Sequence, residues 1–403
     1  MRGDHTGSSQ FRQRLIEFAA EPQVRTTLAQ LAPTVSAAAL DDIFAGMSGA
    51  KVRVFPAEWA PVLQHALEST DDQRVQAGVR VAHAQAKTGL SQKLISTLQQ
   101  IGQNKQLEQR IRLQAFSASS VARANRKLNA PELSADVAAF VTGSLSVDTP
   151  GELRGFAVEI LSSAAANQTL MKAMIAALPQ TGPAELQQLL PVVCRSASES
   201  FVDDLLTSLE KSPFAVTLSE KFLRTELAGI SPAAPDRAAE LFRRIHQDRD
   251  IRRARMERVL TKMETADERR GQSIFHSSKT SCIVCHQMGY LGGNIGPGLR
   301  NIGSIRSDRD LLESILFPSA SFVRSYEPVT ILMTSGKSFS GLIREENSSV
   351  LSLALNAQKT VTLERKRIDR VIPSRVSIMP AGLGKLLSDQ DLADLVKFLK
   401  ESR

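Results

Sequence analysis

The sequence predicts a mainly α-helical protein with two regions, the second of which carries an inserted small antiparallel β-sheet or barrel. Up to about residue 264, apolar residues recur at helical spacing in segments of roughly 10 to 16 residues. Between residues 326 and 372 they alternate instead, as in strands. At 403 residues the chain is also long for one compact core. We therefore expect domains at 1–264 and 265–403, with the inserted strands at about 322–373.

The first region is predicted to be a string of short amphipathic helices separated by Gly, Pro, Ser or Asp. Arg74, Arg110 and Arg154 each begin a similar register near the start of a helix, at spacings of 36 and 44 residues. Such periods are typical of two-helix repeats, because each pair buries its apolar stripe against the next. The pattern resembles HEAT-like repeats and predicts an α-solenoid, with an irregular helical bundle as the alternative.

The second region is predicted to begin and end with helices. A short helix covers residues 268–275, and an amphipathic helix that begins after Ser388 closes the chain. Between them lie four predicted strands, at 326–333, 338–345, 350–355 and 360–364, with turns at 334–337, 346–349 and 356–359. The strands thus interrupt what is otherwise one helical domain.

Composition excludes several classes of protein. The net charge is +8, but 50 basic residues are interspersed with 42 acidic ones and form no basic block, so we expect no nucleic-acid partner. No apolar run approaches the roughly 18 residues of a membrane span, so we expect no transmembrane segment. Three cysteines make no disulfide framework, and Cys194 in the apolar run LLPVVC is predicted to be an inert buried thiol.

Residues 282–286, Cys-Ile-Val-Cys-His, form the C-x-x-C-H motif that attaches haem c. The thiols of Cys282 and Cys285 would form thioether bonds to the haem vinyl groups, and the adjacent imidazole of His286 would ligate the iron. With three Cys and six His in the chain, a chance match is improbable. The motif therefore predicts one covalent haem c.

Three other interpretations of the motif are weaker. A zinc site would combine Cys282, Cys285 and His286 with His276, but adjacent Cys and His residues fit a tetrahedral arrangement poorly. A thioredoxin-like dithiol needs a βαβ setting, which this sequence lacks. The last interpretation leaves two thiols without a chemical role.

An electron-transfer haem needs a second ligand on the opposite face of the ring, and Met379 is the candidate. It lies 93 residues after His286, but removal of the strand-rich segment leaves a path of 41. Met288 is tethered to the side of His286, and Met333 lies in a predicted strand. Alternatives are bis-His ligation by His276, or a core methionine without a ligand role.

The order of these motifs resembles class I cytochrome c. The matching residues are Gly271, Phe275, the C-x-x-C-H motif, Gly296-Pro297-Gly298-Leu299, Met379-Pro380 and the final helix LADLVKFL. The resemblance implies that the first and last helices cross, with Gly271 permitting close approach and with Phe275, Leu395 and Phe398 near the contact.

The same resemblance implies further roles around the haem. The Pro297 carbonyl would accept a hydrogen bond from the His286 ring and so fix its tautomer, and Leu299 would line the haem pocket. Three residues are candidates for the haem propionates only because they lie near the motif: Tyr290, Arg300 and Asn301.

A larger pattern, from about Gly271 to Leu399, is similar to the haem-binding C-terminal domain of a bacterial family described as membrane-bound dehydrogenases. The matching stretches are IGPGL, LLESILFPSASFVRSYEPV, SGKSFSGLIREENSSVLSL and VSIMPAGLGKLLSDQDLADLVKFL. In that family HEAT-like repeats often precede the haem domain, and a dehydrogenase-like β-propeller often precedes those. This chain lacks the propeller, so substrate oxidation is not assigned to it.

The leading functional hypothesis is an electron carrier, not an enzyme by itself, with a His286/Met379 haem between a dehydrogenase donor and a cytochrome acceptor. One alternative is an open-site haem enzyme, peroxidase-like or binding a small molecule, in which Met379 does not ligate. Another is a helical-repeat scaffold with an accessory haem. The inserted strands show no catalytic constellation, because their scattered acidic residues are typical of solvated surface: Glu327, Glu345, Glu346 and Asp369. We expect the strands to cover the haem edge or to dock a partner.

Haem attachment at such motifs normally takes place outside the cytoplasm, so we expect a periplasmic or otherwise extracytoplasmic protein. The N-terminal sequence MRGDHTGSSQFRQRL lacks the apolar core of a secretory signal. We interpret this conflict as a misplaced start or as a piece of a longer exported chain.

Overall fold

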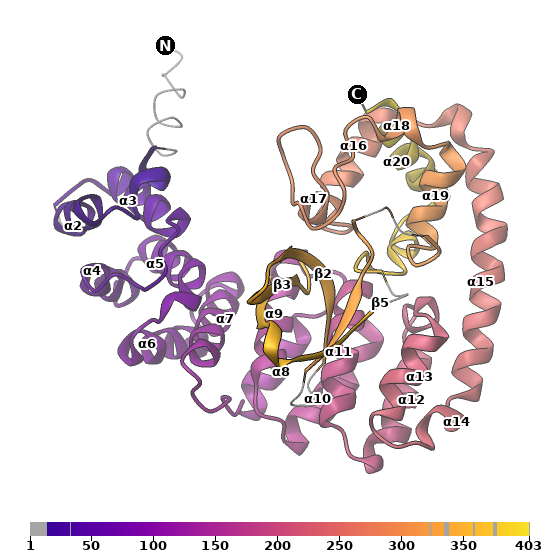
Figure 1. Ribbon diagram of the computed structural model, residues 1–403, viewed down its shortest axis with the longest axis horizontal. Helices are drawn as coiled ribbons and strands as arrows, with labels where there is room; N and C mark the ends of the chain where they lie inside the picture. Colours follow the sequence, from indigo (N-terminus) through magenta and orange to yellow (C-terminus); the bar gives the residue numbers. More distant parts are fainter. Residues whose placement is uncertain are drawn as a thin grey trace. The chain divides into compact units, whose positions relative to one another are not determined.

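The protein is mainly helical and carries one five-stranded antiparallel sheet (Figure 1). The computed structural model describes residues 14–402, except 33, 322, 324, 334–337, 358 and 374–376. Helices precede the strands along the chain, and further helices follow them. The prediction of a mainly α-helical protein with a small inserted antiparallel sheet is therefore confirmed.

Short helices follow one another along the first two thirds of the chain. They are α2 (Pro22–Leu31), α3 (Ala37–Gly49), α4 (Trp59–Leu67), α5 (Asp72–Ala84), η1 (Ala86–Thr88), α6 (Gln92–Gln103), α7 (Gln109–Asn125), α8 (Ala135–Gly143), α9 (Gly151–Ser163), α10 (Gln168–Ala177), η2 (Leu178–Gln180), α11 (Pro183–Ser196), η3 (Glu199–Phe201), α12 (Val202–Lys211), η4 (Ala215–Thr217), α13 (Glu220–Ala228), α14 (Ala234–Arg237) and α15 (Ala239–Leu260). The hydroxyls of Ser36, Ser91 and Ser134 accept hydrogen bonds from first-turn N–H groups, which have no partner inside the helix.

The chain divides into two compact units. One consists of Met1–Ser144 and Phe156–Leu170, and the other of Leu145–Gly155 and Met171–Arg403. The second unit thus contains the later helices of the first region together with the whole predicted haem region. The predicted boundary between residues 264 and 265 is a different division. It is based on the change in the sequence pattern at that point, and it stays a prediction.

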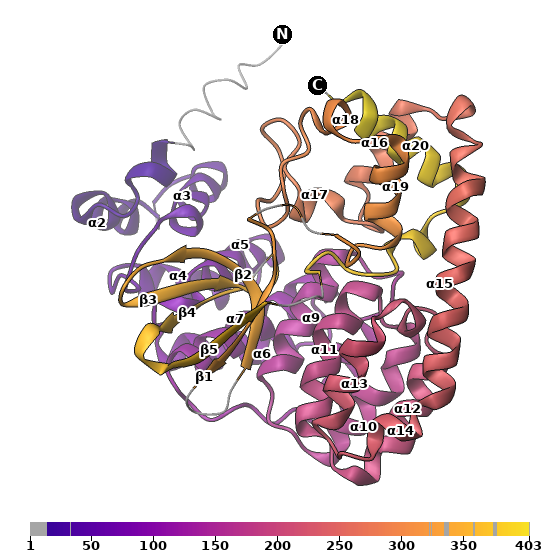
Figure 2. The same ribbon diagram turned by 45° about the vertical axis from the view of Figure 1, so that its right-hand side comes forward.

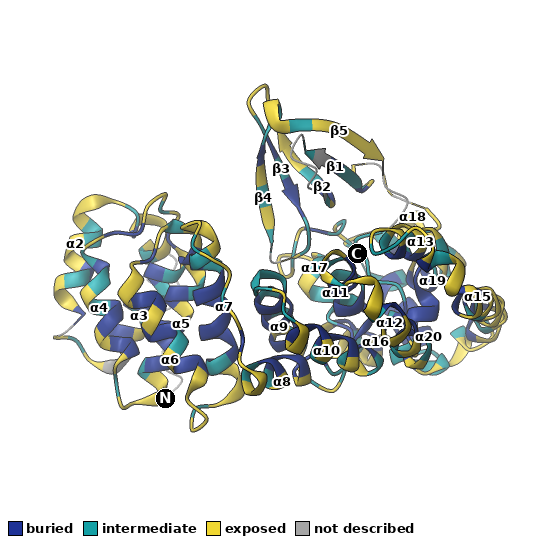
Figure 3. Ribbon diagram, turned by 90° about the horizontal axis from the view of Figure 1, so that it is seen from below, coloured by how far each residue is buried: buried dark blue, intermediate teal, exposed yellow. Residues whose placement is uncertain are grey.

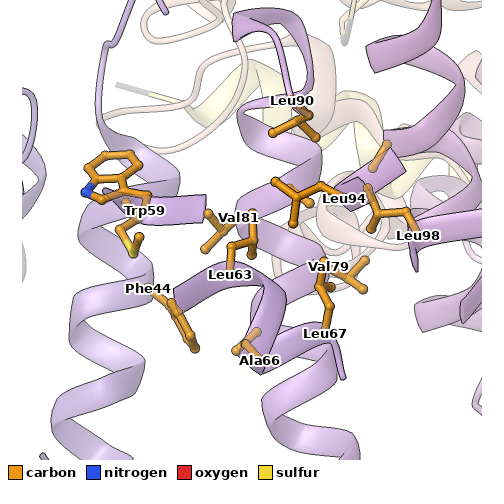
Figure 4. Close-up of a cluster of buried hydrophobic side chains, with 14 of the residues drawn as sticks. Phe44, Trp59, Leu63, Ala66, Leu67, Val79, Val81, Leu90, Leu94 and Leu98 are labelled. Atoms are coloured by element: carbon orange, nitrogen blue, oxygen red, sulfur yellow. The ribbon is translucent and has the colours of Figure 1, made fainter. Parts of the chain in front are cut away.

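Apolar side chains from α3 to α7 form the core of the first unit. Figure 4 shows its labelled members, all buried: Phe44, Trp59, Leu63, Ala66, Leu67, Val79, Val81, Leu90, Leu94 and Leu98. Helix α4 contacts α5 and α6, while α5 and α6 both contact α7. Helix α4 thus packs against the two helices that follow it, and α7 against the two that precede it, so that each amphipathic helix buries an apolar stripe.

The long helix α15 connects the earlier helices of the second unit to the C-terminal ones. It contacts α12 and η4 as well as α19 (Asp308–Leu316) and α20 (Asp389–Glu401) (Figure 2). Met256 and Val259, near its end, pack into the core between the C-terminal helices. Arg255 donates to the carbonyl oxygen of Leu387 and to Asp389 Oδ1, both over 2.6 Å.

The C-terminal helices surround one small apolar core. Besides α19 and α20 they are η5 (Met263–Thr265), α16 (Glu268–His276), α17 (Cys282–Cys285), α18 (Ile302–Ile305) and η7 (Leu383–Leu386). Helices α16 and α20 cross in close contact. Their backbones approach so closely at Gly271 that an added Cβ would overlap the carbonyl oxygen of Asp394. The rings of Phe275 and Phe398 lie 5.6 Å apart, and Leu395 is buried in the same core. The contact that the resemblance implies is therefore confirmed.

The sheet has the strand order β4-β3-β2-β1-β5 with antiparallel pairing throughout. Its strands are β1 (Val329–Met333), β2 (Ser338–Glu346), β3 (Val350–Ala354), β4 (Thr360–Glu364) and β5 (Ile368–Pro373), with η6 (Arg365–Arg367) before β5. The first half of β2 pairs with β1 and its second half with β3. The sheet is open, with edges at β4 and β5, so the alternative of a barrel was wrong. The predicted turn at 334–337 lies outside the described residues.

The fifth strand is an addition to the four predicted ones. Strand β5 is mostly exposed, in contrast to β3 (Figure 3), and it ends in Pro373, as an edge strand can because its outer N–H groups need no partner. Among the residues that the structure describes, no helix combines the length and the apolar character needed to cross a membrane.

Candidate functional site

The C-x-x-C-H motif forms a single helical turn, α17, directly after α16. Asp267 begins α16 by accepting a hydrogen bond from the N–H of Arg270 over 2.8 Å. The connecting loop is closed by Thr280, whose hydroxyl donates to the Ile274 carbonyl oxygen over 2.7 Å. Because residues three apart on a helix lie on one face, the turn directs Cys282 and Cys285 to the same side.

The two half-buried thiols contact different apolar clusters. Cys282 packs against the core between α16, α19 and α20. Cys285 packs with the buried residues Ile295, Leu342 and Ala354, the last two of which belong to strands β2 and β3. The inserted sheet therefore lies against the Cys285 side of the motif.

The imidazole of His286 is fixed by the loop that follows the motif. Its Nδ1 lies 2.9 Å from the carbonyl oxygen of Pro297. A carbonyl oxygen can only accept a hydrogen bond, so Nδ1 carries the proton and Nε2 keeps its lone pair in the neutral ring. A Cβ at Gly296 would lie 2.6 Å from Cε1 of the ring, so only glycine fits against this face. The hydrogen bond that the resemblance implies is thus present, and it selects the tautomer of a metal-binding histidine.

Burial favours the uncharged forms of the groups in the motif. It raises the pKa of the Cys285 thiol to about 11, with Cys282 adding to the effect, and it also raises the pKa of Cys282. Burial lowers the pKa of His286 against the opposing hydrogen bond from Pro297. A reactive redox dithiol has a lowered thiol pKa, so these shifts disfavour the thioredoxin-like interpretation.

Met379 lies in the apolar surroundings of the motif. It packs against the same core as Cys282 and Leu299, while the preceding Ile378 packs in the cluster of Cys285. Cys282, Leu299 and Met379, which are up to 97 residues apart in the sequence, thus pack against one core. Residues 374–376, just before this loop, lie outside the described residues.

The other methionines of this region differ in position. Met333 packs inside the sheet, in a separate cluster with Ile331 and Leu353. Met288 packs against the same core as Met379, and its N–H donates to the Leu291 carbonyl oxygen in a tight turn. As a candidate iron ligand, Met333 is therefore disfavoured by its position in the sheet. Met288 is disfavoured only because it lies two residues after His286 in the sequence.

His276 is an exposed residue at the end of α16. Its Nδ1 lies 2.8 Å from the carbonyl oxygen of Gln272, one turn earlier in the same helix. Within the described parts of the chain, no group of three or more His, Cys, Asp or Glu side chains is arranged to hold a metal ion. A covalent haem needs no such group, because the thioether bonds hold the porphyrin and the porphyrin nitrogens hold the iron.

The residues named for the propionates lie in the chain segment that follows the motif. Tyr290 is 95% exposed, Arg300 is also exposed, and Asn301 has a left-handed backbone with φ of 65° just before α18. The third cysteine, Cys194 of α11, is 1% exposed, and burial raises its thiol pKa to about 12, as expected for an inert thiol.

Sequence reasoning missed two residues that hold the Met379 loop. The Gln187 side chain of α11 donates to the carbonyl oxygen of Ser377 over 2.7 Å. The Ser319 hydroxyl accepts from the Ser377 N–H over 3.0 Å. Gln187 and Ser377 are 190 residues apart, and Gln187 lies outside the stretches that carry the resemblance. Only the three-dimensional structure connects them.

Comparison of the sequence with models of known protein families gives no match. A search of curated proteins likewise finds no relative.

Proposed function

We propose that this chain is a c-type cytochrome that carries single electrons. One haem would be bound covalently by Cys282 and Cys285, with the iron ligated by His286 and Met379. The observation that carries the proposal is the fixed tautomer of His286 beside two half-buried thiols one helical turn apart. The haem, when bound, supplies the one-electron chemistry.

The residues of the site would bind, orient and exclude water. Pro297 holds the His286 ring, and Gly296 lets the backbone lie against it. Leu299, Met379 and the surrounding core provide apolar walls. An axial methionine and burial of the ring both raise the reduction potential. These features suit a carrier, and they require no substrate chemistry.

We propose that residues 265–403 form a cytochrome c-like domain and that residues 1–264 form a HEAT-like solenoid. The crossing of α16 and α20 at Gly271 supports the first assignment. The packing of α4 on α5 and α6, and of α7 on the same two helices, supports the second. The solenoid would hold a partner, and the haem would relay its electrons.

The inserted sheet would cover the haem on the side of Cys285. Leu342 and Ala354, from neighbouring strands, are buried against Cys285, and Arg344 donates to the carbonyl oxygen of Asn294 in the loop after the motif. We propose a dehydrogenase as electron donor, a cytochrome as acceptor and a location outside the cytoplasm, where haem is attached to such motifs.

Absorption spectroscopy of methionine variants tests the ligation. The protein would be produced with the cytochrome c maturation machinery and an added export signal. We expect a c-type spectrum with the weak methionine-to-ferric-iron band at its red end, and we expect Met379→Ala to abolish that band. Met288→Ala and Met333→Ala are the matched controls and should retain it.

Each other outcome changes the proposal in a defined way. Loss of the band in Met288→Ala would assign the ligand to Met288. Covalent haem without the band in the unsubstituted protein would favour an open-site enzyme or bis-His ligation. Absence of covalent haem would refute the proposed function.

A further inference from the structure

We propose that Gln187 of α11 is a positioning residue that keeps Met379 available as the iron ligand. The inference rests on the proposed function and extends it. It makes the axial ligand of the haem depend on a helix that the sequence assigns to the preceding helical region.

Three hydrogen bonds hold the backbone just before Met379. Gln187 Nε2 donates to the carbonyl oxygen of Ser377 over 2.7 Å, and the N–H of Ser377 donates to Ser319 Oγ over 3.0 Å. The hydroxyl oxygen of Ser377 in turn accepts from the N–H of Met379 over 3.1 Å. Both backbone groups of Ser377 are thus tied to side chains from elsewhere, and Met379 is tied to Ser377.

These hydrogen bonds lie beside a cavity of about 520 Å³ whose lining includes Gln187, Ser319 and Ala381. Side chains across an open space make no dispersion contact with the loop. On this side the two hydrogen bonds of the Ser377 backbone tie the loop to Gln187 and Ser319, while packing holds it further along, at Gly382, where an added Cβ would lie 2.7 Å from the Thr217 hydroxyl oxygen. On the other side, Ile378 and Met379 pack in the apolar clusters of the motif.

The constraint matters because the thioether sulfur of methionine is an uncharged and weak metal ligand. Such a ligand competes with stronger ones only if it is already positioned when it binds, since its ordering then costs no further free energy. A loop released at Ser377 would let Met379 leave the iron more often. The hold on Met379 is therefore measurable as its resistance to displacement.

The neighbouring glutamine on α11 provides a charge-matched control. Gln187→Glu removes the amide donor and places a carboxylate against the Ser377 carbonyl oxygen. Gln188 uses its Oε1 as an acceptor for Asn356 Nδ2 over 2.8 Å, and Gln188→Glu keeps that acceptor. It loses only a 3.2 Å hydrogen bond to Ala184 within its own helix. Both variants thus add the same charge to the same helix.

The experiment titrates the ferric full-length holoprotein with imidazole and follows loss of the methionine-to-iron band. We expect half-displacement of Met379 at an imidazole concentration at least about fivefold lower in Gln187→Glu than in the unsubstituted protein, the effect of losing one net hydrogen bond. Gln188→Glu should titrate like the unsubstituted protein. Equal titration of all three proteins would overturn the inference.

Two further variants keep the inference testable if Gln187→Glu does not fold. Gln187→Leu removes the donor without adding charge, and Ser319→Ala removes the other anchor of Ser377. Each should lower the half-displacement concentration, and unchanged values for both would overturn the inference. Failure of the proposed function looks different, because the unsubstituted protein would then lack covalent haem or the methionine band.

Discussion

The core of the first unit and the core between α16 and α20 are built in different ways. In the first unit, large side chains such as Trp59 and Leu63, both 0% exposed, fill the space between helices. Between α16 and α20 the backbones themselves approach, with Gly271 against the carbonyl of Asp394. The Asp394 side chain is 1% exposed and accepts a hydrogen bond from Arg270 Nε over 2.6 Å.

The difference indicates where each core tolerates change. A core of large side chains relaxes partly around a substitution, whereas a backbone contact through glycine leaves no room for one. The two cores can also be followed separately. Trp59 is the only tryptophan of the chain and lies in the first unit, and the absorbance of the proposed haem reports on the second.

The largest effect is expected from Gly271→Ala. The new methyl group would overlap the carbonyl oxygen of Asp394 and force α16 and α20 apart, at a cost of about 3 kcal/mol in the free energy of unfolding. Urea unfolding followed by haem absorbance measures it. Gly155→Ala is the matched control, because a Cβ there meets open space. The control should stabilise its helix by up to about 1 kcal/mol. Equal effects of the two substitutions would contradict the packing described for α16 and α20.

Leu63→Ala should have an effect of similar size on the other core. Removal of a fully buried leucine side chain leaves a cavity and costs about 3 kcal/mol. We expect the unfolding transition of Trp59 fluorescence to shift, while the transition of haem absorbance stays in place. A shift of both transitions by the same amount would show that the two cores unfold as one.

Asp394→Asn is expected to destabilise the crossing of α16 and α20 by about 2 kcal/mol, because hydrogen bonds to a charged group are lost and the exposed Arg270 partner limits their strength. Burial acts to raise the pKa of Asp394, but the hydrogen bonds from Arg270 and the Asp267 N–H outweigh it and hold the pKa below its ordinary range. Equilibrium unfolding in urea, followed by haem absorbance, measures the loss. Arg269→Ala, at an exposed neighbouring position, is the control and should change stability by less than about 0.5 kcal/mol.

The lowered pKa also fixes the sign of the pH dependence. The stabilisation by Asp394 is complete above the pKa of the unfolded carboxyl, about 3.9, and is lost as the pH falls through the lower folded value. Unfolding curves between neutral and acidic pH should therefore converge for Asp394→Asn and the unsubstituted protein at low pH. A difference that grows on acidification would contradict this assignment.

The smallest effects are expected at two helix caps of the same chemistry. Ser388 begins α20 in a capping box with Asp391, and Ser91 begins α6 with a single hydrogen bond. Replacement of either by alanine should cost about 1 kcal/mol. Ser388→Ala should shift the transition of haem absorbance and Ser91→Ala that of Trp59 fluorescence. Unchanged midpoints would show that these caps are frayed in solution.

Local patterns predicted the elements of both cores well. Most helices and four strands could be predicted because apolar periodicity is a property of neighbouring residues. Strand β5 could not, since an exposed edge strand shows little apolar alternation. The charged segment after residue 246 belongs to the continuous helix α15, which buries Met256 and Val259 near its end.

Some residues of the candidate site could likewise be predicted from the sequence, and others could not. The motif and its Pro297 partner lie within 16 residues of one another, so spacing and resemblance could predict them. Gln187, Ser319 and Leu342 reach the site through long-range packing, which leaves no signature in a single sequence.

The most direct test of the central claim is the intact mass of the purified protein after denaturation and acidic extraction of free haem. The account predicts a chain heavier by one haem, and loss of that increment when Cys282 and Cys285 are both replaced by serine. A protein from cells with active maturation machinery that carries no such increment would contradict the assignment of the motif as a haem attachment site.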